Sequence, residues 1–149
     1  MAGRAFVSIM FDPKQDVFVN ADERSVKQML LNLLSNAVKY SGPGGIAVIL
    51  LEVAANDRVI YGVKDTGLGM TGEEQQKALE PFVQAGQHLE TVEGNGTGLG
   101  LPIVKGLIDA HNGMLRIEST KGVGSKIWVE FPAERLMRTT PAKAAAAVA

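Results

Sequence analysis

The stretch KQMLLNLLSNAVKYS, from Lys27 to Ser41, decides the fold of this 149-residue chain. Its apolar residues recur at steps of three and one, which is the spacing of an amphipathic helix with one broad face toward a core. Asn32, Asn36 and Lys39 stand at i, i+4 and i+7 and share a second, polar stripe. Asn is a poor helix former because its amide competes for backbone hydrogen bonds. Two Asn one turn apart, closed by Lys39 and Tyr40, therefore indicate a helix face placed for contacts.

The composition is typical of a single globular domain. The chain is 46% hydrophobic and carries a net charge of −1, which is enough apolar content for one core and gives no sign of a nucleic-acid or membrane surface. It contains no cysteine, which excludes disulfides and thiolate metal sites. No apolar run approaches the roughly 20 residues of a membrane span, and no signal-peptide pattern is present. We therefore expect a soluble, cytoplasmic domain.

Apolar periodicity predicts strands and helices along the rest of the chain. Asp22 is the expected N-cap of the central helix, and Thr71 with Glu74 forms a capping box that opens a short helix. We expect Phe82 and Trp128 to lie in the core. The expected strands are residues 5–11, 17–19, 46–53, 58–64, 114–120 and 125–131. The expected helices run from Asp22 to about residue 40, from the capping box to about residue 79, and over residues 101–111 with Pro102 in the first turn.

The segment Asp65-Thr66-Gly67-Leu68-Gly69-Met70 follows the fourth expected strand directly. A carboxylate at a strand end, followed by glycines that let a ligand approach the backbone, is typical of a binding site. Asp and Gly are also ordinary turn residues, so a plain strand-to-helix turn is the alternative interpretation.

Hydrophobic periodicity is lost from Val83 to Thr97. A loop of this length inside a compact domain is either disordered or functional. A glycine stands at every second position from Gly94 to Gly100, immediately before the last expected helix. Backbone N–H groups and the helix dipole at such a place favour phosphate. Neither the P-loop nor the Rossmann glycine pattern fits this segment.

Four ordered motifs, NLLSNAVKYS, DTGLGM, PFVQ and GNGTGLGLPIVK, resemble the N, G1, F and G2 boxes of sensor histidine kinases. More broadly they resemble the ATP-binding superfamily of DNA gyrase B, the mismatch-repair ATPases and the heat-shock chaperone ATPase. The resemblance covers about residues 5–132 and implies a two-layer α/β sandwich, with a mixed sheet of about five strands and three main helices on one face. Residues 1–132 would be the ATP-binding catalytic domain, and residues 133–149 an Ala-rich, disordered tail.

The resemblance also implies site roles and two cofactors, ATP and Mg²⁺. Asn36 would coordinate Mg²⁺ through its amide oxygen, a hard ligand of the kind that this ion prefers. Asn32 would support metal or phosphate, Lys39 would contact phosphate, and Tyr40 would line the pocket; Asn32, Asn36 and Lys39 are the expected catalytic residues. Asp65 would accept a hydrogen bond from the adenine amino group. The other implied nucleotide-binding residues are Gly67, Gly69, Met70, Gly96, Thr97, Gly98, Leu99, Gly100 and Ser125, of which Gly67 and Gly69 would let the base and ribose approach and Ser125 would lie near the adenine.

The implied function is transfer of the γ-phosphoryl group of ATP to a histidine on a separate dimerisation and phosphoacceptor domain, with a response regulator as the indirect partner. Hydrolases of the superfamily carry a Glu where this chain has Asn32, so rapid ATP hydrolysis is not expected. The chain resembles the catalytic half alone, because His111 is expected to be structural and His88 to lie on the surface.

Two alternatives remain open, a non-catalytic nucleotide-binding or interaction module and a stand-alone ATPase of the superfamily. Related kinases commonly carry an Arg just before the G2 glycines, but this chain has neither Arg nor Lys between Val83 and Leu101. We therefore expect slow turnover unless a partner supplies the missing cation.

Overall fold

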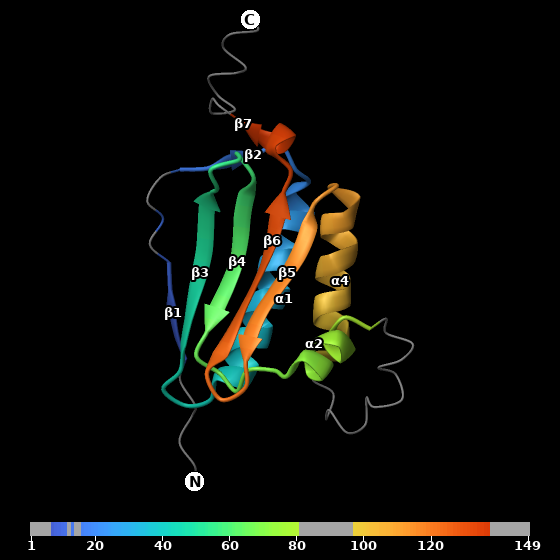
Figure 1. The fold of residues 1–149 in the computed structure, drawn as a ribbon. Coiled ribbons are helices and arrows are strands. Elements are labelled where there is room, and N and C mark those ends of the chain that lie inside the picture. Colours follow the sequence, from blue (N-terminus) through green and yellow to red (C-terminus); the bar gives the residue numbers. More distant parts are fainter. Residues whose placement is uncertain (1–6, 12, 14–15, 81–96, 138–149) are drawn as a thin grey trace, which may run out of the picture.

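The computed structural model describes residues 7–11, 13, 16–80 and 97–137 (Figure 1). Five strands form a mixed sheet in the order β1-β3-β4-β6-β5, in which β1 is parallel to β3 and the other neighbours are antiparallel. This confirms the predicted two-layer α/β architecture. The sheet strands are β1 (Ser8–Met10), β3 (Ile46–Val53), β4 (Val59–Asp65), β5 (Met114–Thr120) and β6 (Gly124–Phe131), and the helices are α1 (Glu23–Ser41), α2 (Gly72–Ala78) and α4 (Thr97–Ala110).

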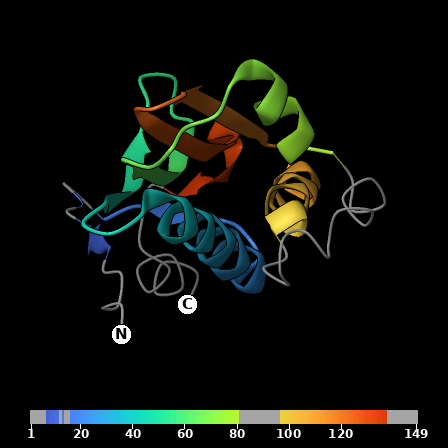
Figure 2. The same cartoon turned by 90° about the horizontal axis from the view of Figure 1, so that it is seen from below.

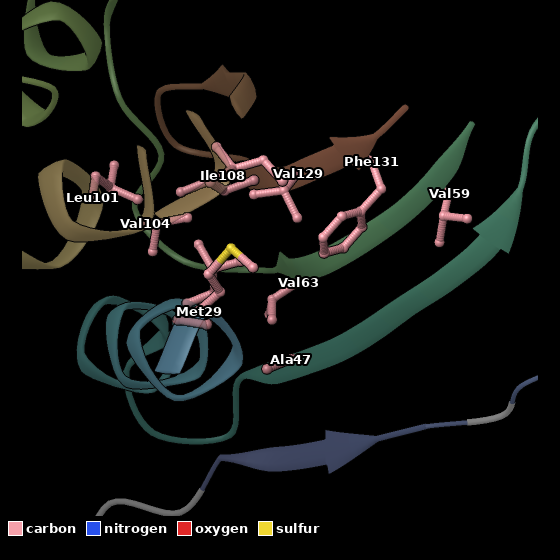
Figure 3. Close-up of a cluster of buried hydrophobic side chains, with 12 residues drawn as sticks. Met29, Ala47, Val59, Val63, Leu101, Val104, Ile108, Val129 and Phe131 are labelled. Carbon is pink, nitrogen blue, oxygen red and sulfur yellow. The ribbon is translucent and has the colours of Figure 1, made fainter. Parts of the chain in front are cut away.

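The helices α1 and α4 cover one face of the sheet, and the core lies between these two layers (Figures 2 and 3). Asp22 caps α1 as predicted, because its carboxylate accepts a 2.9 Å hydrogen bond from the backbone N–H of Ser25. The predicted capping box of Thr71 and Glu74 opens α2. The core contains Met29, Leu33 and Ala37 of α1, Leu101, Val104 and Ile108 of α4, and Ala47, Val59, Val63, Ile127, Val129 and Phe131 of the sheet. None of the helices in the described ranges is long and apolar enough to cross a membrane.

Trp128 lies outside the core, so its predicted position was wrong. Ile127 and Val129, its neighbours on β6, are buried, and successive side chains of a strand point to opposite faces. Trp128 therefore stands on the face opposite α1 and α4, where its indole Nε1 donates to Glu130 at 3.1 Å and Lys126 Nζ lies 4.5 Å from the ring centroid.

The helix α4 begins at Thr97, four residues before the predicted start. Gly98 and Gly100 therefore belong to the helix, and Pro102 lies inside it rather than in the first turn. Proline lacks an N–H, so its position costs α4 the hydrogen bond that the Gly98 carbonyl would otherwise accept. Of the loop predicted from Val83 to Thr97, Thr97 is the first residue of α4. The rest of that loop and the predicted core position of Phe82 lie outside the described residues.

The described structure continues past the predicted domain boundary at residue 132. A short 3-10 helix, η2 (Ala133–Arg135), leads to β7 (Leu136–Met137), which pairs with β2 (Phe18–Val19) in a two-stranded sheet. The Arg135 guanidinium donates to the carbonyl of His111 at 2.8 Å and to that of Asn20 at 2.7 Å. These contacts hold the segment after β6 against the start of α1.

His111 connects the end of α4 to the start of α1. It is 6% exposed, its Nε2 accepts from the backbone N–H of Asp22 at 3.1 Å, and its Nδ1 lies 2.8 Å from the carbonyl of Leu107. A carbonyl can only accept, so Nδ1 carries the proton and the neutral imidazole satisfies both bonds. The ring also packs edge-on against Phe131, with the ring centroids 5.9 Å apart. These contacts agree with the predicted structural role of His111.

We expect His111→Leu to lower the free energy of unfolding by about 1–3 kcal/mol, because it leaves the Asp22 N–H without its acceptor while keeping an apolar side chain in place. Chemical denaturation measures this change. Gln76→Leu, an exposed position on α2, is the control and should change stability by less than about 0.5 kcal/mol. Equal stability of the two variants would contradict the role assigned to His111.

Candidate functional site

A pocket of about 320 Å³ lies where the inner face of the sheet meets α1, α2 and the start of α4. Figure 2 looks toward this end of the molecule. The pocket brings together residues that are far apart in the sequence. Six of the predicted site residues line it: Asn36, Tyr40, Asp65, Gly69, Met70 and Ser125.

Asp65 is the buried carboxylate of the pocket. It ends β4, pairs with Ser125 of β6 in the sheet register, and is 9% exposed. Its Oδ1 accepts a 2.7 Å hydrogen bond from the backbone N–H of Gly67. Burial raises the pKa of Asp65, and the backbone hydrogen bonds from Gly67 and Ser125 offset part of that rise. The site thus contains an acceptor whose pKa is raised above the ordinary value of an aspartate.

The two glycines after Asp65 let the chain pass close to other backbone segments. A Cβ at Gly67 would lie 2.5 Å from the carbonyl oxygen of Tyr40. Gly69 has a φ of 71°, and a Cβ there would overlap the carbonyl of Thr120. The sequence suggested that these glycines admit a ligand, and the structure shows that packing of the turn against α1 and β5 also requires them.

A serine pair lies at the edge of the pocket, which Ser125 lines and Ser119 does not. The Oγ atoms of Ser119 and Ser125 lie 2.7 Å apart, and Ser119 Oγ also accepts from the backbone N–H of Met70 at 2.7 Å. Sequence reasoning missed Ser119. The available signal was its place two residues after Ile117, where the inward alternation of β5 changes from apolar to polar.

The polar stripe of α1 faces the first turns of α4. Asn32 donates its amide Nδ2 to the carbonyl of Gly100 at 3.3 Å, while its Oδ1 accepts from Gln28 Nε2 at 2.7 Å. Asn36 lines the pocket, and its Oδ1 lies 3.9 Å from the point that a Cβ on Gly100 would occupy. The structure therefore places Asn36 at the pocket and Asn32 in a contact between the two helices.

Lys39 is not among the residues that line the pocket. Its Nζ is shielded from solvent, has no hydrogen-bond partner within the described ranges, and lies 5.6 Å from the centroid of the Tyr40 ring. Desolvation lowers the pKa of Lys39. Its phosphate contact stays a prediction.

Two lysines that sequence reasoning did not select also line the pocket. Lys121, in the turn between β5 and β6, pairs with Glu74 of α2 at 3.0 and 3.1 Å. Lys77 of α2 is 4.0 Å from Glu73, and both side chains are mostly exposed, so this ion pair holds it weakly. No sequence pattern identifies these lysines, because their place depends on how α2 docks beside the sheet.

Other predicted residues are only partly described. Gly96 lies outside the described residues. Thr97, Gly98 and Leu99 form the start of α4, but their side chains are not described. Within the described ranges, no group of three or more His, Cys, Asp or Glu side chains is placed to hold a metal ion.

Curated relatives of this chain are named as histidine kinases. The chain is 41% identical to the cell-division control histidine kinase PdhS of Brucella anthropi and 40% identical to that of Brucella suis biovar 1, in each case over 78% of this chain and 12% of the relative. The chain thus spans about an eighth of the length of these relatives.

Solved structures of histidine kinases share the fold. The nucleotide-free catalytic domain of histidine kinase ThkA matches with a TM-score of 0.69 and 29% identity, covering 85% of this chain and 80% of that domain. Full-length ShkA in complex with AMPPNP matches with a TM-score of 0.71 and 30% identity, covering 91% of this chain and 27% of ShkA.

The family match covers α1, the residues that line the pocket, and the strands β3 to β6. Residues 21–135 match the family described as histidine kinase-, DNA gyrase B-, and HSP90-like ATPase. These residues include Asn36, Asp65 and Ser125, which the fold brings to one pocket. The chain therefore belongs to the histidine kinase-, DNA gyrase B-, and HSP90-like ATPase family.

Proposed function

We propose that this domain binds ATP with Mg²⁺ and donates the γ-phosphoryl group to a histidine on a separate dimerisation and phosphoacceptor domain, in two-component signalling in the cytoplasm. A response regulator would then receive the phosphoryl group. The main observation behind the proposal is that Asn36 and Asp65 line the same pocket. Two further facts support it. PdhS and ThkA are named as histidine kinases, and the ShkA structure is a complex with AMPPNP.

The base would bind at Asp65. An ionised carboxylate only accepts hydrogen bonds, so it fits the exocyclic amino group of adenine. Guanine carries a carbonyl oxygen at the corresponding position, which would face the carboxylate without a proton between them. Leu101 and Ile127, which continue the core into the pocket, supply an apolar surface for the flat base.

The phosphates would extend toward Asn36 and the start of α4. Asn36 offers an amide oxygen to Mg²⁺, and the absence of a carboxylate cluster among the described residues fits a metal held mainly by phosphate oxygens and water. Bound Mg²⁺ would neutralise charge on the phosphates. Lys77 and the shielded Lys39 are the cations that would add to this neutralisation.

Asn32 favours transfer over hydrolysis. A hydrolase needs a general base to activate water, and an amide has no basic site at neutral pH. In addition, the two ends of the Asn32 amide are engaged by Gly100 and Gln28. Phosphoryl transfer needs mainly positioning and charge neutralisation, and the partner histidine would supply the attacking atom.

The first test is calorimetric titration of ATP–Mg²⁺ into the chain, with GTP as the control and phosphate release measured in parallel. We expect selective ATP binding with negligible phosphate release. In Asn36→Ala the affinity should lose its Mg²⁺ dependence but keep a measurable part of the nucleotide binding. Ser35→Ala, an exposed neighbour on α1, should behave like wild type. Steady phosphate release would instead favour the stand-alone ATPase, and no binding the non-catalytic module.

We expect ATP affinity to fall as the pH is lowered and Asp65 becomes protonated, because protonation turns one carboxyl oxygen into an O–H donor and removes the charge that strengthens the bond from the adenine amino group. Since burial raises the pKa of Asp65, the loss should occur above the ordinary carboxyl range of about 3.9. Asp65→Asn should bind ATP at least about tenfold more weakly and without this pH dependence. Asp109→Asn, an exposed residue on α4, is the control, and an unchanged pH profile in Asp65→Asn would rule out the assignment.

Removing the charge of Lys77 should weaken ATP binding about threefold to tenfold and leave adenosine binding unchanged. Lys27→Met is a matched control, because Lys27 is an exposed helical lysine with an i−4 glutamate, as Lys77 is, but does not line the pocket. The affinities should recover in Lys77→Arg. If Lys77→Met and Lys27→Met bind ATP equally well, the phosphates do not contact Lys77.

A further inference from the structure

Three polar side chains stand side by side at the end of the sheet, where the apolar core stops. In the sheet register, Ser125 of β6 pairs with Ser119 of β5 on one side and with Asp65 of β4 on the other. Asp65 and Ser125 are buried and line the pocket. Ser119 is half-buried behind Ser125 and is not one of the lining residues.

The hydrogen bonds of Ser119 fix the direction of its proton. Its Oγ lies 3.0 Å from the carbonyl of Gly124, which can only accept, so the single hydroxyl proton of Ser119 points there. The backbone N–H of Met70 donates to the same Oγ at 2.7 Å. The remaining contact of this oxygen is Ser125 Oγ, also at 2.7 Å. Because Ser119 has a single proton, all three contacts are hydrogen bonds at once only if Ser125 is the donor in this pair.

The direction of the Ser125 proton determines whether Ser125 offers a donor or an acceptor to the pocket. A hydroxyl has one proton and two lone pairs, and the proton of Ser125 is directed at Ser119. Ser125 therefore presents only lone pairs to the pocket, beside the carboxylate of Asp65. The end of the pocket where the nucleobase would bind therefore offers hydrogen-bond acceptors from both Ser125 and Asp65.

We infer that Ser119 is a positioning residue for base selection, which holds Ser125 as an acceptor and so favours a base with an amino group over one with a carbonyl. This inference rests on the proposed nucleotide binding and adds a specificity device to it. Without Ser119, the hydroxyl of Ser125 is free to rotate and to donate to a carbonyl oxygen. Ser119 acts through Ser125 and does not touch the base itself.

The test compares ATP with ITP, whose hypoxanthine base carries a carbonyl in place of the amino group. We expect Ser119→Ala to lower the ratio of ATP affinity to ITP affinity about threefold to tenfold, the range for one neutral hydrogen bond. Ser119→Thr keeps the hydroxyl and should restore the wild-type ratio. Ser119→Cys, which keeps the size but hydrogen-bonds weakly, should shift the ratio in the same direction and serves if Ser119→Ala does not fold.

A double-mutant cycle separates this role from simple support of the turn at Met70. In a Ser125→Ala background, Ser119→Ala should not change the ATP to ITP ratio further, because the hydroxyl on which it acts is gone. Equal weakening of ATP and ITP in Ser119→Ala, or the same shift in both backgrounds, would overturn the inference alone. A wild-type chain that binds neither nucleotide would overturn the proposed function and this inference with it.

Discussion

The packing of α1 against α4 and the sheet is the constraint on which the rest of the structure depends. Met29 and Leu33 are buried by this packing, and successive residues of a helix are separated by a fixed angle of about 100°. The same rotation that buries these two side chains therefore turns Asn36 to the pocket and Asn32 to Gly100. A change in the core that rotated α1 would move the site with it.

The pocket is the place where the inner face of the sheet changes from apolar to polar. On β4 the change occurs between Val63 and Asp65, and on β6 between Ile127 and Ser125. Because neighbouring strands are in register, Asp65 and Ser125 come to the same level. The turn after Asp65 then packs its backbone against α1 and β5, which holds the carboxylate in place although no described residue forms an ion pair with it.

Local patterns predicted the elements whose signals are complete within a few residues. The periodicity of α1, the apolar run of β3 and the capping box at Thr71 belong to this class, and the structure contains all three. The position of Trp128 depends on the phase of β6, which strand pairing sets. The start of α4 was missed because Gly98 and Gly100 are poor helix formers in isolation, whereas the helix here is held by packing of its buried face. The places of Ser119 and Lys77 at the site could not be predicted, because they depend on contacts between segments that are distant in the sequence.

The site combines a fixed part with a part whose charges are not yet paired. The backbone N–H of Gly67 donates to Asp65, and beside it the backbone N–H of Met70 and Ser125 bond Ser119. The groups that would bind the nucleobase are therefore held in place before a ligand arrives. The lysines are held less firmly than Asp65. Lys39 has no hydrogen-bond partner in the described part of the chain, and Lys77 lies 4.0 Å from Glu73. A shielded ammonium without a partner is costly, so a phosphate group that approached it would gain a strong interaction. In the proposed kinase, recognition of the base would therefore belong to this domain alone, while placement of the phosphates would depend on what binds next to them.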